Sequence, residues 1–313
     1  MTDRPAPAHV PVLLDEVLAH LAPRPGGRYI DATVSSGGHA RALLAASAPA
    51  GGVLGIDRDR EVLAAAREHL AEAIAAGRVQ LVHDSFANLG EIAAAYGFAA
   101  ADGILFDLGL SSYHLDASGR GFAFARDDEP LDMRFDPEDP NGEPAAAIIA
   151  TRDARELTEI LRTYGEERFA SRIARTIVAR RRTEPIATSG QLLTVIEQSL
   201  PPAVRWRARR DAARVFQAFR IAANRELDAV AAALPQAVAA LAPGGRLVLL
   251  SFHSLEDRLV KHFLRQEVAE GRLRLLTKKP ILPSEAEIAA NPRAASAKLR
   301  AAERVATEGP SGT

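Results

Sequence analysis

Alternation between short apolar segments and helical patterns constrains the fold of this chain more than any other feature. Four apolar segments come first: RYIDAT (28–33), GVLGIDRD (52–59), RVQLVHD (78–84) and ADGILFDLG (101–109). Helical patterns at 39–46 and 60–76 separate the first three. Apolar strands joined by helices are typical of βαβ units, in which helices cover both faces of a parallel sheet. We therefore expect an α/β fold.

The alternation stops near residue 114 and resumes later. Residues 126–144 are acidic and proline-rich, and helical patterns follow at 153–163, 166–182 and 188–199. The α/β pattern returns with a helix over 212–233, a fifth strand over 244–254, a helix over 255–270 and two more candidate strands at 272–278 and 298–306. This arrangement predicts a discontinuous core, residues 1–113 and 206–313, with an inserted helical domain at 114–205.

Composition excludes several kinds of chemistry. The sequence has no cysteine, so disulfides, thiolate nucleophiles and cysteine-ligated metals are excluded. It also lacks a run of about 18 apolar residues and a signal-peptide layout at its start, so we expect a cytoplasmic protein that does not span a membrane. The acidic residues show no metal-ligand spacing, and no metal is expected. Net charge is -1, so any nucleic-acid surface must be local.

The first strand runs into a loop of small residues, ATVSSGGH (32–39), which begins a helix. Its spacing departs from the G-x-G-x-x-G of dinucleotide-binding folds, and it lacks the Lys-[Ser/Thr] ending of a P-loop. A flexible loop without a fixed cation suits a ligand whose carboxylate and sugar approach the backbone closely. The loop alone leaves open a plain strand–helix turn without a ligand.

The ends of the next strands favour a ligand. Asp57 lies 19 residues after Gly38 and ends the second strand, where an acid can accept ribose hydroxyls. Asp57 or Asp59 could instead cap the next helix. Phe86 follows the third strand and could lie against an adenine or in the core, and Asp107 ends the fourth strand. Taken together, these strand ends predict a domain that binds S-adenosylmethionine (SAM).

Longer motifs resemble the bacterial MraW/RsmH methyltransferase family over nearly the whole chain. They are SGGHA, GIDRD, DLGLSS, RGFAF, PLDMRFD, YGEERFASRIARTIV, VFQAFRIAANREL and LAPGGRLVLLSFHSLEDRLVK. The resemblance implies a class I SAM-dependent methyltransferase with a Rossmann-like, mostly parallel seven-stranded sheet and an inserted helical domain. It also implies methylation of the N4 amine of a cytidine in the decoding centre of 16S rRNA, with rRNA within the small ribosomal subunit as the expected partner. Family precedent allows a homodimer, although no residue demands one.

The resemblance assigns cofactor binding by motif. The residues concerned are Gly37, Gly38, His39, Asp57, Phe86, Asp107 and His114. Three positions depart from the family pattern: Ala32 and Ser35 replace glycines, and His114 replaces a glutamine. Because these side chains are small or can form hydrogen bonds, we expect weaker or rearranged binding and not its loss. The family's His-Pro-Ala-Thr-Arg is also changed, to the sequence RDAAR (210–214).

Three residues at the ends of strands four and five are candidates for catalysis. The exocyclic amine of cytosine is a poor nucleophile, so a catalyst must orient it and accept its hydrogen bonds as positive charge develops. Asp107 is expected to do this. His253 could receive the departing proton or could be a buried structural histidine, and Phe252 could stack on a flipped cytosine. His9, in HVPVLL, could fold over the same site.

An arginine-rich region predicts the RNA-binding surface. Residues 150–225 contain 16 arginines and no lysine, with fewer acidic residues. The candidate contacts are Arg172, Arg175, Arg181, Arg182, Arg207, Arg210 and Arg214, with Trp206 among them. Arginine suits phosphate and base stacking, and an interleaved aromatic is compatible with single-stranded RNA. A solvated helix face is the alternative.

Three other functions remain open from the sequence. The first keeps the chemistry but methylates DNA or another RNA. The second is a binding or assembly factor that has lost turnover, which the changes at Ala32, Ser35 and His114 would suggest and the presence of Asp57 and Asp107 opposes. The third, an NAD-dependent dehydrogenase, is disfavoured by the spacing of the glycine loop.

Overall fold

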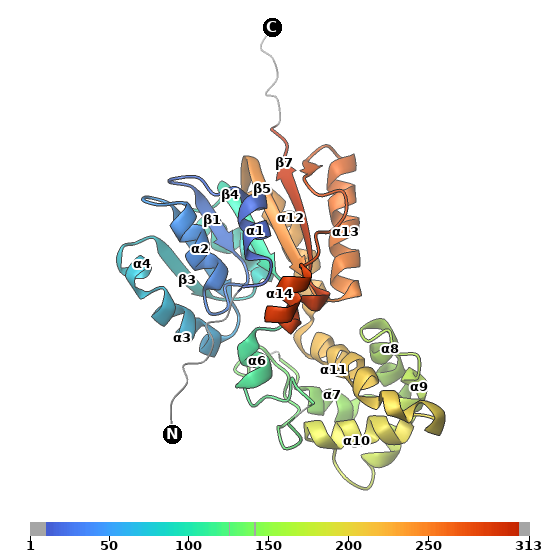
Figure 1. Ribbon diagram of the computed structural model, residues 1–313. Coiled ribbons are helices and arrows are strands. Elements are labelled where there is room, and N and C mark those ends of the chain that lie inside the picture. The colour runs from blue at the N-terminus through green and yellow to red at the C-terminus, as the bar shows by residue number, and fades with distance from the viewer. Residues whose placement is uncertain (1–10, 125, 141, 307–313) are drawn as a thin grey trace. The chain divides into compact units, whose positions relative to one another are not determined.

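The computed structural model describes residues 11–124, 126–140 and 142–306, and it divides the chain into two compact units. The second unit is Leu110–Glu226, and the first is formed by the segments before and after it (Figure 1). His9 lies outside the described residues. No helix in the described part of the chain is long and apolar enough to span a membrane.

A seven-stranded sheet forms the centre of the first unit, in the order β3-β2-β1-β4-β5-β7-β6. The strands are β1 (Arg28–Asp31), β2 (Gly52–Asp57), β3 (Val79–His83), β4 (Ala101–Asp107), β5 (Leu241–Ser251), β6 (Leu273–Leu275) and β7 (Lys298–Arg304). The first five strands are parallel, and β7 runs antiparallel to both β5 and β6. The predicted mostly parallel α/β sheet of seven strands is confirmed.

Helices cover both faces of this sheet, because successive side chains of a strand point to opposite faces. Tyr29 and Leu105 belong to one buried apolar cluster, whereas Ile30 and Ile104, their neighbours in sequence, belong to another. The first cluster also contains side chains from α1 (Leu14–Leu21), α2 (Gly38–Ala46) and α3 (Arg60–His69). The second contains side chains from α5 (Leu89–Ala95), α12 (Glu226–Ala240) and α13 (Ser254–Ala269). Shorter elements are α4 (Ala71–Ala75), α14 (Glu285–Ala290), η1 (Phe86–Asn88) and η3 (Pro292–Ser296).

The second unit is helical and has a core of its own. Its elements are α6 (Ser112–Asp116), α7 (Ala145–Thr151), α8 (Ala154–Thr163), α9 (Ala170–Arg180), α10 (Ser189–Ser199), η2 (Pro202–Arg207) and α11 (Ala208–Asn224). The expected insertion, residues 114–205, lies within this unit. The sequence alone assigns α11 to the other unit, yet its Val215, Phe216 and Phe219 are buried in the helical core beside Leu157 and Ile173.

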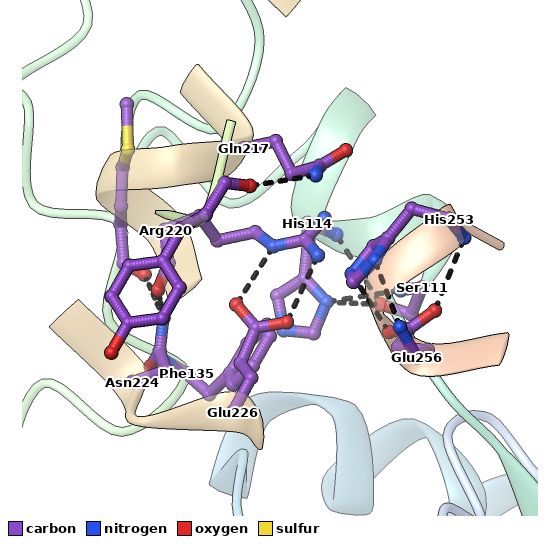
Figure 2. A network of polar contacts seen from close by, with 11 residues as sticks. Ser111, His114, Phe135, Gln217, Arg220, Asn224, Glu226, His253 and Glu256 are labelled. Atoms are coloured by element: carbon purple, nitrogen blue, oxygen red, sulfur yellow. Dashed lines mark hydrogen bonds and ion pairs between the residues drawn. The ribbon is translucent and has the colours of Figure 1, made fainter. Parts of the chain in front are cut away.

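A single residue separates α11 from α12, so the continuous helix predicted over 212–233 is wrong. Arg225 adopts a left-handed conformation, φ 51, and its N–H closes α11 on the carbonyl of Ile221. Glycine usually occupies such a position, so the sequence carries no signal for the break. Next to it, Arg220 forms two hydrogen bonds of 2.8 and 2.9 Å to the carboxylate of Glu226 (Figure 2).

Asn224 ties the acidic, proline-rich segment of the second unit to α11. Its Oδ1 accepts a hydrogen bond of 2.8 Å from the backbone of Phe135, and its Nδ2 donates one of 2.6 Å to the carbonyl of Met133 (Figure 2). Both bonds are buried, and Asn224 itself is 4% exposed. Because a buried amide satisfies two backbone groups here, a segment that is a loop by sequence has a fixed backbone at this point.

Candidate active site

The carboxyl ends of four neighbouring strands meet at one edge of the sheet. In the order β2-β1-β4-β5 these strands are parallel, so their last residues lie side by side. They end in Asp57, Asp31, Asp107 and Ser251. Ligands of open α/β sheets bind outside this edge, where the loops that follow the strands provide contacts.

The loop after β1 has a backbone that requires glycine at its end. Gly37 precedes α2 with φ 89, and a Cβ at this position would lie 2.9 Å from Cδ1 of Leu70. A Cβ on Gly38 would lie 2.6 Å from Cγ of Pro11. Ser35 is also left-handed, at φ 49, a conformation that glycine adopts more easily than serine. The loop therefore keeps its backbone exposed to a ligand at the cost of some strain at Ser35.

Asp57 is held against this loop. Its Oδ2 accepts a hydrogen bond of 3.0 Å from the backbone N–H of Ser35, and its Oδ1 accepts one of 3.0 Å from that of Asp59. Asp59, not Asp57, caps α3, accepting hydrogen bonds from Glu61 and Val62. Since each carboxylate oxygen has two lone pairs, Asp57 retains capacity to accept hydroxyl hydrogens.

Phe86 lies just after β3, at the start of η1. Its ring meets that of Phe106 edge to face, with centroids 5.7 Å apart, and it is partly buried against the apolar cluster on that face of the sheet. One side of the ring is thus fixed by packing. Contact with an adenine stays a prediction.

His39 connects the glycine loop to Asp107. The histidine is buried; its Nε2 lies 3.1 Å from the carbonyl of Val12, and its Nδ1 lies 3.6 Å from Oδ2 of Asp107. A carbonyl oxygen can only accept, so Nε2 carries a proton and donates it. The backbone N–H of Asp107 donates to the hydroxyl of Thr33 at 2.6 Å. These contacts fix Asp107 and leave its Oδ1 buried without a hydrogen-bond partner.

Asp31 is a second buried carboxyl group at this edge, and it was not among the residues predicted from the sequence. It is 1% exposed, and its Oδ2 has no hydrogen-bond partner, whereas its Oδ1 accepts a bond of 3.3 Å from the backbone of Thr33. Burial, with a smaller effect of Asp57, raises the pKa of Asp31 to about 7. Burial, together with the charges of Asp31 and Glu256, raises the pKa of Asp107 to about 8.

These carboxyl groups make the site suitable for a cation. Neither Asp31 nor Asp107 forms an ion pair with a lysine or arginine in the described ranges, and each keeps one buried oxygen unsatisfied. A positive charge among them would favour their ionised forms and offset their mutual repulsion. A ligand with a sulfonium or ammonium group therefore suits this edge of the sheet.

The raised pKa values predict that the free protein becomes less stable as pH rises from about 4 to 8. In this window Asp31 and Asp107 keep protons that the unfolded chain, with aspartate pKa near 3.8, has released. The folded state then binds more protons, so the free energy of unfolding falls with pH and levels off above about 8. Thermal unfolding across this range measures the effect. Asp31→Asn should flatten the decline, and an unchanged slope would contradict the assignment.

The end of β5 places Phe252 and His253 beside Glu256. The strand stops at Ser251, not at residue 254 as predicted, because His253 caps α13: its Nδ1 accepts a bond of 3.3 Å from the backbone N–H of Glu256. Its Nε2 lies 3.1 Å from Oε1 of Glu256, without good hydrogen-bond geometry (Figure 2). Oε2 of Glu256 accepts a bond of 2.8 Å from the backbone of Phe252.

Glu256 was missed by the sequence analysis, although its position three residues after a helix cap is a recognisable signal. It is 2% exposed and holds His253 by both backbone and side chain. Because Nδ1 of His253 already accepts a hydrogen bond, this nitrogen is not available as a proton acceptor. Phe252 packs near Gly109, where an added Cβ would lie 3.4 Å from its ring. Proton transfer by His253 and stacking by Phe252 stay predictions.

His114 belongs to the second unit, where its ring closes the capping box of α6. Its Nδ1 lies 2.8 Å from the hydroxyl of Ser111 and accepts a bond of 3.1 Å from the backbone of the same residue (Figure 2). The imidazole is buried, with ring centroids 5.0 Å from both Phe122 and Phe135. A histidine in place of the glutamine thus has a local structural role, and its contact with a cofactor stays a prediction.

Some of the predicted RNA-binding arginines are exposed, and others have partners within the protein. Arg172, Arg175, Arg182 and Arg210 are exposed. Arg181 donates a hydrogen bond of 2.7 Å to the carbonyl of Arg152, and Arg214 pairs with the buried carboxylates of Glu167 and Asp211.

Two neighbouring residues in η2 form an aromatic platform in the second unit. Trp206 is 82% exposed, and the guanidinium carbon of Arg207 lies 5.9 Å from the centroid of its ring. A large exposed aromatic beside an arginine matches a surface for unstacked bases.

Similarity to known proteins shows the family of this chain. The model of the MraW methylase family matches residues 6–305. The ribosomal RNA small subunit methyltransferase H of Thermomicrobium roseum is 52% identical over 96% of this chain and 95% of its own length, and that of Frankia alni is 50% identical over 95% of each. A methyltransferase structure from Streptococcus mutans in complex with SAH has 14% identity and a TM-score of 0.45, over 97% of this chain and 100% of that one.

Proposed function

This chain belongs to the MraW methylase family, and we propose on that basis that it methylates the N4 amine of a cytidine in the decoding centre of 16S rRNA. Relatives at about half identity are named as methyltransferases of small-subunit ribosomal RNA, which supports that substrate. The observation that carries the chemistry is the unsatisfied Oδ1 of Asp107 at the end of β4. Such an activity belongs in the cytoplasm.

The family is SAM-dependent, and the described residues fit this cofactor. In this proposal Asp57 would accept hydrogen bonds from the ribose, and the loop after β1 would let the cofactor approach its backbone closely. Asp31 and Asp107 would stabilise the positive charge. SAM supplies an electrophilic methyl group on a sulfonium that leaves as a neutral thioether.

Asp107 would act on the amine. With a pKa of about 8 it is mostly protonated in the free protein at neutral pH, and a nearby positive charge would ionise it. As a carboxylate it can accept hydrogen bonds from N4, orient the nitrogen lone pair and receive the proton that N4 loses once the new N–C bond has formed. No cysteine is present for the covalent adduct that methylation at C5 of a pyrimidine generally needs.

The proposal is tested on small ribosomal subunits from a strain that lacks its own copy of the enzyme. Protein and labelled SAM are added, the RNA is digested to nucleosides, and N4-methylcytidine is measured. Its appearance is the expected result. Labelled methyl groups in another nucleoside, or none despite SAM binding, would reject the assignment to N4.

For RNA binding we propose the exposed arginines of the second unit. Arg172→Gln combined with Arg175→Gln should weaken rRNA binding and lower the slope of log K against log salt by about 1.4 to 1.8, since each lost phosphate contact contributes about 0.7 to 0.9. Filter binding at several salt concentrations measures this. Arg214→Gln serves as the comparison, because it should lower stability by breaking pairs with Glu167 and Asp211 and leave the salt slope unchanged. Equal slopes in all three proteins would locate the RNA contact elsewhere.

A further inference from the structure

The lysines of this chain are confined to one region. Arginine outnumbers lysine 35 to 4, yet all four lysines lie between residues 261 and 298. Three of them, Lys261, Lys278 and Lys279, line a single hollow of about 240 Å³ in the first unit, together with Arg265. Among the described residues, no carboxylate lines this lysine hollow.

Five cations line the lysine hollow, and among the described residues only Arg300 has an acidic partner. Arg300 forms a hydrogen bond of 2.7 Å to Asp257, which also pairs with Lys298 outside the hollow. By contrast, Lys261, Arg265, Lys278 and Lys279 form no ion pair with a carboxylate in the part of the chain that the structure describes. Their mutual repulsion is relieved only by an external anion or by solvent.

Backbone hydrogen bonds fix the segment that carries two of these lysines. The segment that carries Lys278 and Lys279 is bonded to β7 at both ends: Leu276 donates to the carbonyl of Ala301 at 2.9 Å, and Ile281 donates to that of Leu299 at 2.9 Å. On the other side, Lys261 and Arg265 are four residues apart on α13 and therefore share one helix face. Two rigid elements thus present positive charge to the same space.

The lysine hollow lies along a helix that starts at the candidate active site. α13 begins at Ser254, next to His253, and Lys261 follows seven residues later, roughly 10 Å along the helix axis. Lysine is a compact point charge that suits phosphate without reading a base, whereas arginine more often makes forked contacts. An RNA strand with one base in the active site would therefore need only a few nucleotides for its backbone to reach the lysine hollow.

We infer that the lysine hollow binds the phosphodiester backbone of the substrate RNA, as a second contact surface on the methyltransferase unit. This inference rests on the proposed function, since it takes RNA as the substrate. It adds contacts outside the arginine-rich unit, and these are independent of base sequence.

The test compares two variants with the same change in net charge. Lys278→Gln combined with Lys279→Gln removes two positive charges from the hollow; Arg67→Glu changes the charge by the same amount at an exposed position of α3. Binding of 16S rRNA is measured over a range of salt concentrations. We expect the double variant to raise Kd about tenfold near 0.1 M salt and to lower the salt slope by about 1.4 to 1.8. SAM affinity should stay unchanged, which checks that the protein is folded.

Each other outcome has a defined meaning. Equal losses in the double variant and Arg67→Glu would overturn the inference, because net charge alone would explain them. Unchanged RNA binding with lost binding of inorganic tripolyphosphate would also overturn it and assign the hollow to a small polyanion. A wild-type protein that forms no N4-methylcytidine but shows the predicted slope difference would reject the proposed reaction and support the RNA surface.

Discussion

Asp107→Asn should lower kcat by about 100- to 1000-fold without unfolding the protein. Asparagine keeps the shape of the side chain, but its amide cannot accept the proton that N4 loses. Its NH₂ group is also a hydrogen-bond donor, where the carboxylate would accept hydrogen bonds from the amine. Removing one well-placed polar group from an active site typically has an effect of this size. The free protein should be as stable as the wild type or more so at pH 8, because burial and the charges of Asp31 and Glu256 disfavour the carboxylate there. Single-turnover methylation and thermal unfolding measure the two effects.

The matched control for Asp107 lies on the same strand. Asp102, near the other end of β4, accepts a hydrogen bond of 2.7 Å from the backbone of Arg28 and pairs with Arg24. Asp102→Asn should therefore affect stability and leave kcat near the wild-type value. If the single-turnover rate of Asp107→Asn stays within about threefold of wild type, the carboxylate does not take part in the reaction.

Asp57→Ala should raise the Kd for SAM by about 10- to 100-fold. The substitution would remove a charge-assisted hydrogen bond to the ribose, typically worth about 1.5 to 3 kcal/mol. It also removes the contact that anchors the Ser35 backbone. Calorimetric titration with SAM measures the change. The rate at saturating SAM should fall much less, because the proposed role of Asp57 is to bind the sugar and not the amine.

A neighbouring aspartate provides the comparison for Asp57. Asp59→Ala removes the cap of α3, so it should lower stability by about 1 kcal/mol and change SAM affinity only slightly. If both substitutions weaken SAM binding equally, the effect comes from the position of α3, and a direct role of Asp57 is excluded.

The fold could be predicted from the sequence where burial leaves a regular pattern. The strands are apolar on both faces and flanked by helices, so β1 to β5 and their order along the chain could be predicted. The division between α11 and α12 was not, because Arg225 adopts a left-handed conformation without a glycine to signal it. The helix expected over 60–76 also divides, at Leu70, whose φ of -111 departs from helical geometry.

Part of the candidate site could also be predicted, because some of its residues follow regular patterns in the sequence. Asp57 follows from its spacing after the loop, and Asp107 from its place at a strand end. Asp31 and Glu256 belong to the site because Asp31 is buried and Glu256 contacts His253. Neither burial nor contact could be predicted from the sequence alone. The sequence shows the charge of Arg214 but not Glu167, the buried partner 47 positions away.

The placement of the helical unit between β4 and β5 has a consequence for synthesis of the chain. These strands are hydrogen-bonded neighbours in the middle of the sheet, yet more than 130 residues separate the end of β4 at Asp107 from the start of β5 at Leu241. At about 5 to 20 residues per second, a ribosome needs roughly 7 to 27 s to reach β5 after completing β4. Through that interval an apolar strand containing Ile104, Leu105 and Phe106 has one edge unpaired. Such an edge can pair with other chains, so the nascent protein depends on protection until its own β5 emerges.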